Sequence, residues 1–302
     1  MTAHAGTGHP GIGLGARLET SGHGVDGSSI AAAATAFEAA GFDSVWVSDH
    51  VVQPRTVESD YPYSADGKAT WSTEVPYLEA VVAMTLIAAV TKRVEIGTAV
   101  LVLPQRNPVL LAKQLATLDV IAGGRVNLGV GAGWLAEEFA ALSADFAGRG
   151  TAMTESIEIL RRCWTGFPEG FEGTSYTLPE SLVSLPAPAR PIPVLVGGMS
   201  PVALRRVAAV GDGWLAQVDG PVVDLAALEA ALAALDAACA KVGRDRSELR
   251  IALRVTGPGE RAGEIAPQLP ALEALGISDV IVSGGSDAAA IAALGAALTS
   301  AR

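Results

Sequence analysis

The sequence lacks the features that mark membrane, secreted and disulfide-stabilised proteins. No apolar run reaches the roughly 18 residues that a membrane span needs. Residues 1–11 lack the basic stretch and apolar core of a signal peptide. The two cysteines, Cys163 and Cys239, both fall in helical patterns, so we expect buried free thiols and not a disulfide. Together these absences predict a cytoplasmic protein.

An excess of basic residues is also missing. The formal net charge is −11, which argues against binding to nucleic acid or to an anionic membrane surface. We assign no metal site from the sequence.

The 302 residues are 50% hydrophobic, which is ample for a large core and usual for one α/β barrel. The clearest local pattern begins with VEIGTAVLV, an apolar and β-branched run at residues 94–102. An apolar stripe at helical spacing follows, and Gly123 and Gly124 end it. A second apolar run, VNLGVGAG, comes next at residues 126–133. Strand, helix and strand in this order predict a βαβ unit with parallel strands.

The same alternation continues along the chain and gives eight strands with helices between them. This predicts a (β/α)8 TIM barrel in a single domain over residues 1–302. We expect insertions at about residues 51–76, after the second strand, and 166–193, before the fifth. The main alternative is a doubly wound open sheet. The first strand is not followed by GxGxxG, and an eighth strand–helix pair favours closure.

Polar residues end the predicted second strand, SVWVSDH, at residues 44–50. In a barrel the carboxyl ends of the strands form the active face, so Asp49 and His50 are candidates for chemistry. A histidine beside a carboxylate can donate or accept a proton near neutral pH. The alternative is that Asp49 caps a turn and His50 is simply exposed.

The long excursion at residues 51–76 is interpreted as a flap over the pocket, because loops of this length in compact domains are usually lids. Tyr61, Tyr63 and Trp71 are possible substrate contacts. They could equally attach the flap to the barrel.

Two Gly-rich turns precede predicted helices. Glycine lets the backbone approach a ligand, and a helix N-terminus favours phosphate. Both turns are therefore candidates for binding a phosphate group, and the alternative is an ordinary glycine turn at the end of a barrel strand. They consist of Gly131, Ala132 and Gly133, and of Gly197, Gly198, Met199 and Ser200. Asp119 and Arg125 are assigned to structure, as an ion pair or cap behind the barrel.

Three stretches resemble the luciferase-like monooxygenase superfamily, in particular its branch that depends on the deazaflavin coenzyme F420 in actinobacteria. They are GFDSVWVSDH, then the run from Ile96 to Phe139, then PVLVGGMSPVALRRVAAVGDGW. The resemblance implies that flavin or deazaflavin binds at the mouth of the barrel, with Asp49 and His50 beside the ring and His50 in proton transfer. It also favours a cofactor phosphate or ribityl chain at the two Gly-rich turns. It also implies a non-prolyl cis peptide bond at Ala99-Val100 under the ring, where the alternative is an ordinary strand. Small residues at Thr98 and Ala99 fit either arrangement.

One residue departs from the pattern of the branch. Its sugar-phosphate dehydrogenase carries a catalytic glutamate directly after the GxG of the fourth strand, and Trp134 stands there in this chain. The resemblance therefore argues against that activity and places Trp134 in the wall of the substrate pocket. Glu137 and Glu138 follow in the helix, and we expect them on a solvated face.

Several functions remain open at this point. The first is an F420-dependent oxidoreductase acting on a small, hydrophobic organic substrate, with His50 as proton donor or base. The alternatives are an FMN-dependent two-component monooxygenase that uses O2, a non-catalytic flavin-binding barrel, and an unrelated phosphate-binding lyase or isomerase. The family also implies a reductase that supplies reduced cofactor, and a homodimer.

Overall fold

The computed structural model describes residues 11–302 apart from residues 63, 65, 70 and 258. Its centre is a parallel sheet that closes into a barrel, because β3 pairs with both β2 and β5. The short segments β3 and β4 both pair with β5, so together they count as one barrel strand and the barrel has eight. The barrel segments are β1 (Gly13–Arg17), β2 (Ser44–Val47), β3 (Glu95–Thr98), β4 (Leu101–Val102), β5 (Val126–Gly131), β8 (Val194–Gly197), β9 (Gly213–Asp219), β10 (Arg250–Thr256) and β11 (Asp279–Ser283).

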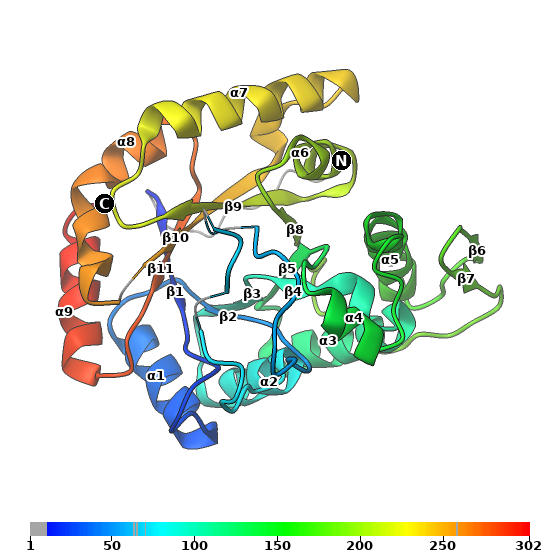
Figure 1. Cartoon of the computed structure of the whole chain (residues 1–302), viewed down its shortest axis with the longest axis horizontal. Coiled ribbons are helices and arrows are strands. Elements are labelled where there is room, and N and C mark those ends of the chain that lie inside the picture. Colours follow the sequence, from blue (N-terminus) through cyan, green and yellow to red (C-terminus); the bar gives the residue numbers. More distant parts are fainter. Residues whose placement is uncertain (1–10, 63, 65, 70, 258) are drawn as a thin grey trace.

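Helices surround the barrel on its outer side (Figure 1). This confirms the (β/α)8 fold. The α-helices of the described residues are α1 (Gly27–Ala39), α2 (Ala80–Val90), α3 (Pro108–Ala122), α4 (Ala136–Ala141), α5 (Arg149–Trp164), α6 (Pro201–Val210), α7 (Leu225–Lys241), α8 (Leu269–Ala274) and α9 (Ala288–Thr299). Short 3-10 helices occur at η1 (Leu103–Gln105), η2 (Arg246–Glu248) and η3 (Gly259–Gln268).

The helix boundaries follow local chemistry. At the start of α3 the Asn107 side chain accepts hydrogen bonds from the amides of Val109 and Leu110, both at 3.0 Å. The helix ends at Gly123, whose φ of +67° suits glycine. The alternation of strands and helices along the sequence also predicts one α-helix over residues 264–275. This prediction is wrong in its first half, where the 3-10 helix η3 precedes the short α8. Pro267 and Pro270 lack the amide hydrogens that a regular α-helix would need there.

Both expected insertions are present. The described part of residues 51–76 contains no helix or strand and runs over the barrel mouth as a lid segment. The second insertion carries a small antiparallel hairpin of β6 (Phe171–Glu172) and β7 (Thr177–Leu178), which projects from the barrel on the right of Figure 1.

The inside of the barrel is filled by a compact apolar cluster. Its largest member is Trp46 on β2, which is fully buried. Gly15 and Gly97 on the flanking strands leave space for the indole, since a Cβ at Gly97 would lie 2.3 Å from a Trp46 ring carbon. Ala99 and Leu215 belong to the same cluster and also line the cavity above it, so the core of the barrel is the floor of that cavity.

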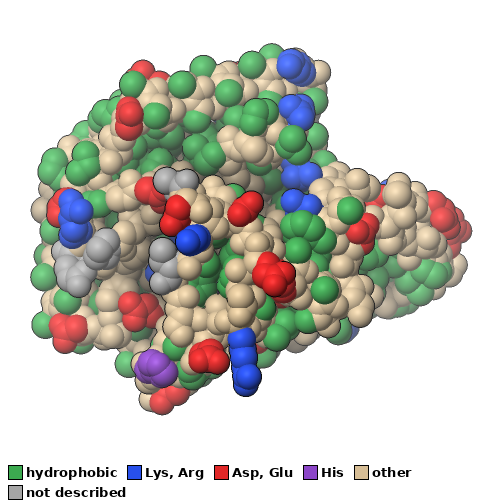
Figure 2. Space-filling view, viewed as in Figure 1, with side chains coloured by type: hydrophobic (Ala, Val, Ile, Leu, Met, Phe, Trp, Pro, Cys, Tyr) green, Lys and Arg blue, Asp and Glu red, His purple; other side chains and the backbone are tan. Residues whose placement is uncertain are grey.

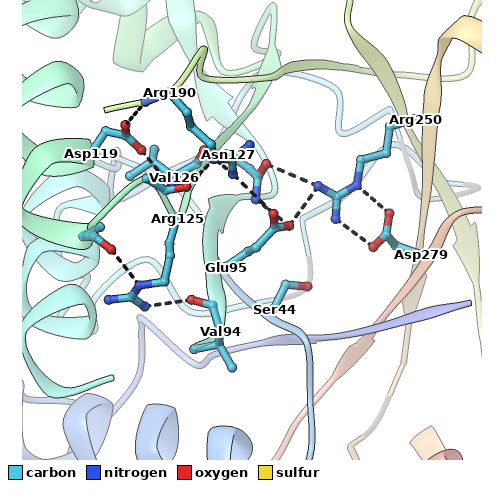
Figure 3. A network of polar contacts seen from close by, with 12 residues as sticks. Ser44, Val94, Glu95, Asp119, Arg125, Val126, Asn127, Arg190, Arg250 and Asp279 are labelled. Atoms are coloured by element: carbon cyan, nitrogen blue, oxygen red, sulfur yellow. Dashed lines mark hydrogen bonds and ion pairs between the residues drawn. The ribbon is translucent and has the colours of Figure 1, made fainter. Parts of the chain in front are cut away.

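A buried polar network crosses the opposite, N-terminal end of the barrel (Figure 3). Arg250 on β10 holds Asp279 on β11 with two contacts of 2.7 Å, and its Nη1 lies 2.9 Å from Glu95 Oε2 on β3. Asn127 on β5 donates to the same Glu95 oxygen at 2.9 Å. The network joins four strands. It pairs Arg250, Asp279 and Glu95, which are the first residues of β10, β11 and β3 and would otherwise be unpaired charges in the barrel.

Asp119 and Arg125 act as caps, and no ion pair joins them among the described residues. Asp119 accepts from the amides of Val126 and Arg190, both at 3.2 Å. Arg125 donates to backbone carbonyls, including that of Val94 at 2.8 Å (Figure 3). Of the two expected arrangements, the structure shows the cap.

The cysteines, the helix lengths and the surface charge relate to further expectations from the sequence. Cys163 and Cys239 are buried free thiols, as expected. Within the described residues, no helix combines the length and the apolar character required to cross a bilayer. Charged side chains of both signs are scattered over the face in Figure 2, with no continuous basic area on it.

Candidate active site

A cavity of about 790 Å³ opens at the carboxyl ends of the barrel strands. Its volume falls in the range of about 300–1,000 Å³ that is typical of small-molecule and cofactor sites. The wall is made by residues at the ends of β1, β2, β5, β8, β9 and β10, by the lid segment, and by the first turns of α5 and α6. This is the end of the barrel where the sequence places the chemistry.

Of the expected site residues that the structure describes, all but two line this cavity. They are Asp49, His50, Tyr61, Trp71, Ala99, Val100, Gly131, Ala132, Gly133, Trp134, Gly197, Gly198 and Ser200. The exceptions are Thr98 and Met199. Thr98 is fully buried, and its hydroxyl donates to the carbonyl of Gly129 at 2.7 Å, so it stabilises the strand pair. Met199 packs against the main hydrophobic core.

The peptide bond Ala99-Val100 is cis, which confirms the expectation from the family resemblance and excludes an ordinary strand. It separates β3 from β4 and presents Ala99 and Val100 to the cavity. The methyl groups of Val100 lie against Gly131 and Gly197, where an added Cβ would approach them to 2.7 and 2.9 Å. A smooth floor of small side chains and backbone results, and a flat ring could lie on it.

His50 is paired with a buried carboxylate that the sequence analysis placed in solvent. Its Nδ1 lies 3.0 Å from Glu138 Oε2, and the side chains of His50 and Glu138 are 13% and 1% exposed. The other carboxylate oxygen accepts from the amide of Val51 at 2.6 Å. Burial raises the pKa of Glu138, but the hydrogen bonds from His50 and Val51 outweigh this and hold it below its usual value.

The solvated face expected for Glu137 and Glu138 is therefore wrong. The helix α4 turns Glu138 inward beneath the strand end that carries His50, and Glu137 toward the lid. The local sequence does not indicate that Glu138 is buried, because its partner His50 lies 88 positions earlier in the chain.

Asp49, adjacent to His50 in sequence, faces a different partner. Its two oxygens lie 2.7 and 2.8 Å from Arg106, and Oδ2 also accepts from the amide of Val102 at 2.9 Å. Asp49 thus fixes β2 to the segment after β4. It does not pair with the imidazole.

Aromatic rings form one wall of the cavity. The rings of Tyr61 and Trp71 from the lid stand edge-on to Trp134, with centroids 5.0 and 6.0 Å away. Trp134 lies 6.4 Å from the His50 ring, and Tyr77 lies 5.4 Å from it. These rings hold the lid to the barrel, as one of the two interpretations expects. Tyr61 and Trp71 also border the cavity, and their contact with a substrate stays a prediction. Tyr63 lies outside the described residues.

The lid is tied to α4 by polar contacts as well. Glu137 accepts from the amides of Glu58 and Ser59 at 2.6 and 3.0 Å, and from the Ser59 hydroxyl at 2.6 Å. The Ser59 hydroxyl also accepts from the amide of Ala136 at 3.0 Å and so caps α4. These hydrogen bonds lower the pKa of Glu137 to about 2, although partial burial opposes the shift.

The sequence analysis missed that four arginines line the cavity, namely Arg17, Arg149, Arg206 and Arg254. Arg149 and Arg206 lie near the Gly-rich turns and donate to the carbonyls of Gly133 and Gly150. No ion pair of the described residues includes Arg17, Arg149 or Arg206. The site is therefore cationic within a chain of net charge −11. Arg17 and Arg254 lie at or near the carboxyl ends of β1 and β10. This position at the active face of a barrel is the sequence feature that could have identified them as site residues.

The chain is similar to known proteins in sequence and in fold. A sequence model of the family described as luciferase-like monooxygenase matches residues 11–258. An uncharacterised protein of Mycobacterium tuberculosis is 41% identical over 182 residues, which are 60% of this chain and 62% of that protein. An F420-dependent glucose-6-phosphate dehydrogenase of Amycolatopsis mediterranei is 35% identical over 182 residues, 59% of this chain and 50% of that protein. The chain thus spans less than two thirds of either relative.

Two solved structures share the fold. One is an F420-dependent secondary alcohol dehydrogenase in complex with an F420-acetone adduct, with a TM-score of 0.75, 19% identity, and coverage of 97% of this chain and 100% of that one. The other is the monooxygenase RslO1 of Streptomyces bottropensis, with a TM-score of 0.71, 18% identity, and coverage of 96% and 98%.

Proposed function

Since the chain belongs to the luciferase-like monooxygenase family, we propose that it is an oxidoreductase that uses coenzyme F420 and a small organic substrate. The observation that carries the proposal is the His50–Glu138 pair at the edge of the cavity floor. A non-catalytic flavin-binding barrel would not require a histidine that is oriented by a buried carboxylate.

The residues around the cavity fit such a cofactor. The floor of Ala99, Val100, Gly131 and Gly197 has no room for larger side chains, which suits a flat ring in contact with the backbone. Toward α5 and α6 the wall becomes cationic with Arg149 and Arg206. An anionic tail with a phosphate would be held there by guanidinium groups.

His50 would hold or move the proton. Glu138 occupies Nδ1, so Nε2 is the nitrogen left for the cavity, and the carboxylate keeps the ring in one orientation. A protonated imidazole can donate from Nε2 to a substrate that is being reduced, and a neutral one can accept a proton in the reverse direction. Trp134 and the lid aromatics would shield this nitrogen from water. When bound, the deazaflavin supplies hydride transfer at C5.

We do not propose glucose 6-phosphate as the substrate, although the chain is similar in sequence to a glucose-6-phosphate dehydrogenase. Trp134 occupies the place where the resemblance predicts a catalytic glutamate, and its ring packs with Tyr61 and Trp71. We expect no turnover of glucose 6-phosphate. A coupled assay with reduced cofactor as readout would show this directly.

We further expect a separate reductase to supply the reduced cofactor, and a homodimer. Helices α2 and α3 pack on each other and carry several exposed apolar side chains, which supports an interface there: Val82, Val109, Leu110, Val120 and Ile121. Light scattering of the purified chain would give the oligomeric state.

The test of the cofactor is a titration of the purified chain with F420 and, separately, with FMN, followed by fluorescence. Tight F420 binding with weak FMN binding supports the proposal. The opposite preference would overturn it in favour of an FMN-dependent monooxygenase that uses O2. As a control, Gly131→Val should abolish binding of the preferred cofactor, because its side chain would occupy the floor next to Val100.

A further inference from the structure

Arg17 lines the cavity but is not among the residues that we propose to hold the cofactor. It is the last residue of β1 and pairs in register with Trp46 on β2 and Ser283 on β11. The two Gly-rich turns lie at the ends of β5 and β8, on the other side of the barrel from β1. Arg149 on α5 and Arg206 on α6 line the cavity near these turns. Arg17 is therefore a second cationic position, separate from the one that suits a cofactor tail.

The guanidinium of Arg17 has no counter-ion among the described residues. Its Nε is buried and has no hydrogen-bond partner, and no carboxylate of the described residues forms an ion pair with it. Asp49 lies in the same part of the wall, but both of its oxygens are held by Arg106. A partly buried cation without a partner is costly, and an anionic ligand would remove that cost.

The neighbours of Arg17 are hydrogen-bonding groups suited to the same ligand. Tyr77, Ser21 and Ser48 line the same cavity. Tyr77 lies close enough to Arg17 for the two to interact electrostatically, and it is joined to Ser48 by a hydrogen bond and to Ser21 by an isolated β-bridge. Burial, together with the charge of Asp49, raises the pKa of Tyr77 to about 12, so its hydroxyl stays protonated and can donate. Arginine and hydroxyl donors at one place form a typical set for an oxyanion.

His50 contacts both this polar group and the aromatic wall. The centroid of its ring lies 5.4 Å from that of Tyr77 and 6.4 Å from that of Trp134. A molecule that reaches from one group to the other would therefore lie close to the imidazole. One end would meet Arg17, and the other would meet Trp134 and Tyr61.

We propose that the substrate is an organic anion, whose carboxylate or phosphate is bound by Arg17 and whose apolar, planar part lies against Trp134 and the lid. This inference rests on the proposed function, because it takes His50 as the proton donor or acceptor. It narrows the substrate from any small hydrophobic molecule to an amphipathic acid.

The experiment uses benzoate, phenyl phosphate and the neutral analogue benzamide as probes. Each is titrated into the full chain, first alone and then saturated with F420, and tryptophan fluorescence reports binding next to Trp134 and Trp71. We expect one of the two anions to bind at least about tenfold more tightly than benzamide, as for a charged hydrogen bond. Which anion binds better distinguishes a carboxylate from a phosphate substrate.

The variants separate Arg17 from the general positive charge of the cavity. Arg17→Gln should reduce the preference for the anion to about one, and Arg17→Lys should keep most of it because the charge remains. Arg149→Gln is the matched control. It removes another cavity arginine and should weaken F420 binding while leaving the anion preference unchanged. Thermal unfolding of each variant verifies that it is folded.

Three results would overturn the proposal. The first is the absence of any anion preference in the unmodified chain. The second is equal loss of preference in Arg17→Gln and Arg149→Gln, which would indicate a diffuse field. The third is an Arg17→Gln variant that loses F420 affinity and keeps its anion preference, which would assign Arg17 to the cofactor. The titration without cofactor remains informative if F420 does not bind, so the two proposals can fail separately.

Discussion

His50 Nδ1 and Glu138 Oε2 lie 3.0 Å apart, although the two residues are separated by 88 positions in the chain. The contact joins the end of β2 to the first turn of α4, and Glu138 is almost completely buried. A carboxylate that accepts from Nδ1 keeps the proton on that nitrogen and holds the imidazole ring in one orientation. The Asp of a Ser-His-Asp triad has the same effect on its histidine.

Glu138→Gln should retain the fold and lower turnover by about 10–100-fold, because the amide no longer fixes one tautomer or stabilises a positive imidazole. The direct measurement is NMR of the imidazole nitrogens, with His50→Ala used to assign the signals. The unmodified protein should show one tautomer with the proton on Nδ1, and the variant a mixture. Unchanged His50 nitrogen signals in Glu138→Gln would show that the carboxylate does not orient the ring.

Glu137→Gln should loosen the lid at neutral pH, because the hydrogen bonds to Glu58 and Ser59 are made to a carboxylate. The folded pKa of about 2 lies below the ordinary value of 4.5. The contribution of Glu137 is therefore complete above pH 4.5 and disappears as the pH falls from there toward 2. Hydrogen exchange of residues 58–59 should differ between the variant and the unmodified protein at pH 7 and converge at low pH. Equal exchange at pH 7 would contradict this.

Gly97→Ala should destabilise the barrel by about 1–3 kcal/mol or more, because the new methyl group would overlap the fixed indole of Trp46. Chemical unfolding gives the change in the free energy of unfolding. Gly285→Ala is the control, since a Cβ at Gly285 would meet nothing within 4 Å and the change should be near zero. Similar losses for both variants would mean that the packing around Trp46 is not responsible.

Arg250→Met should destabilise the protein by about 3–5 kcal/mol, because Asp279 and Glu95 would remain buried without their cation. The double variant Arg250→Met/Asp279→Leu should recover part of the loss by removing one of the stranded charges. Urea denaturation at pH 7 measures both. A double variant that is less stable than the single one would show that the two residues do not act as a pair.

Much of the fold could be predicted because it depends on short-range patterns. The apolar runs at residues 94–102 and 126–133, the prolines after the first and the glycines before the second define one βαβ unit. Repetition of that unit defines a barrel, and the barrel places strand ends such as His50 at one mouth. The cis bond at Ala99-Val100 followed from the family resemblance and not from local propensity.

What could not be predicted depends on contacts between distant segments. Glu138 was misplaced because a glutamate in a short helix is usually solvated, and only the fold shows that its partner is His50. The cationic lining was missed for the same reason, because Arg17 and Arg206 are far apart in the sequence. The break in the helix over residues 264–275 was a local error, since Pro267 and Pro270 were visible in the sequence.

The two neighbouring carboxylates of α4 have a consequence for redesign of the enzyme. Glu138 anchors the start of the lid at His50 and Val51, and Glu137 anchors it again at Glu58 and Ser59. Further along the lid, Tyr61 and Trp71 pack on Trp134, and the carbonyl of Pro76 accepts from the amide of Gly22 at 3.0 Å. The lid is thus held at both of its ends. Replacing the residues between Ser59 and Pro76 should alter which molecules enter the cavity while the contact of Glu138 with His50 is kept, whereas a replacement that begins at residue 51 would disturb both.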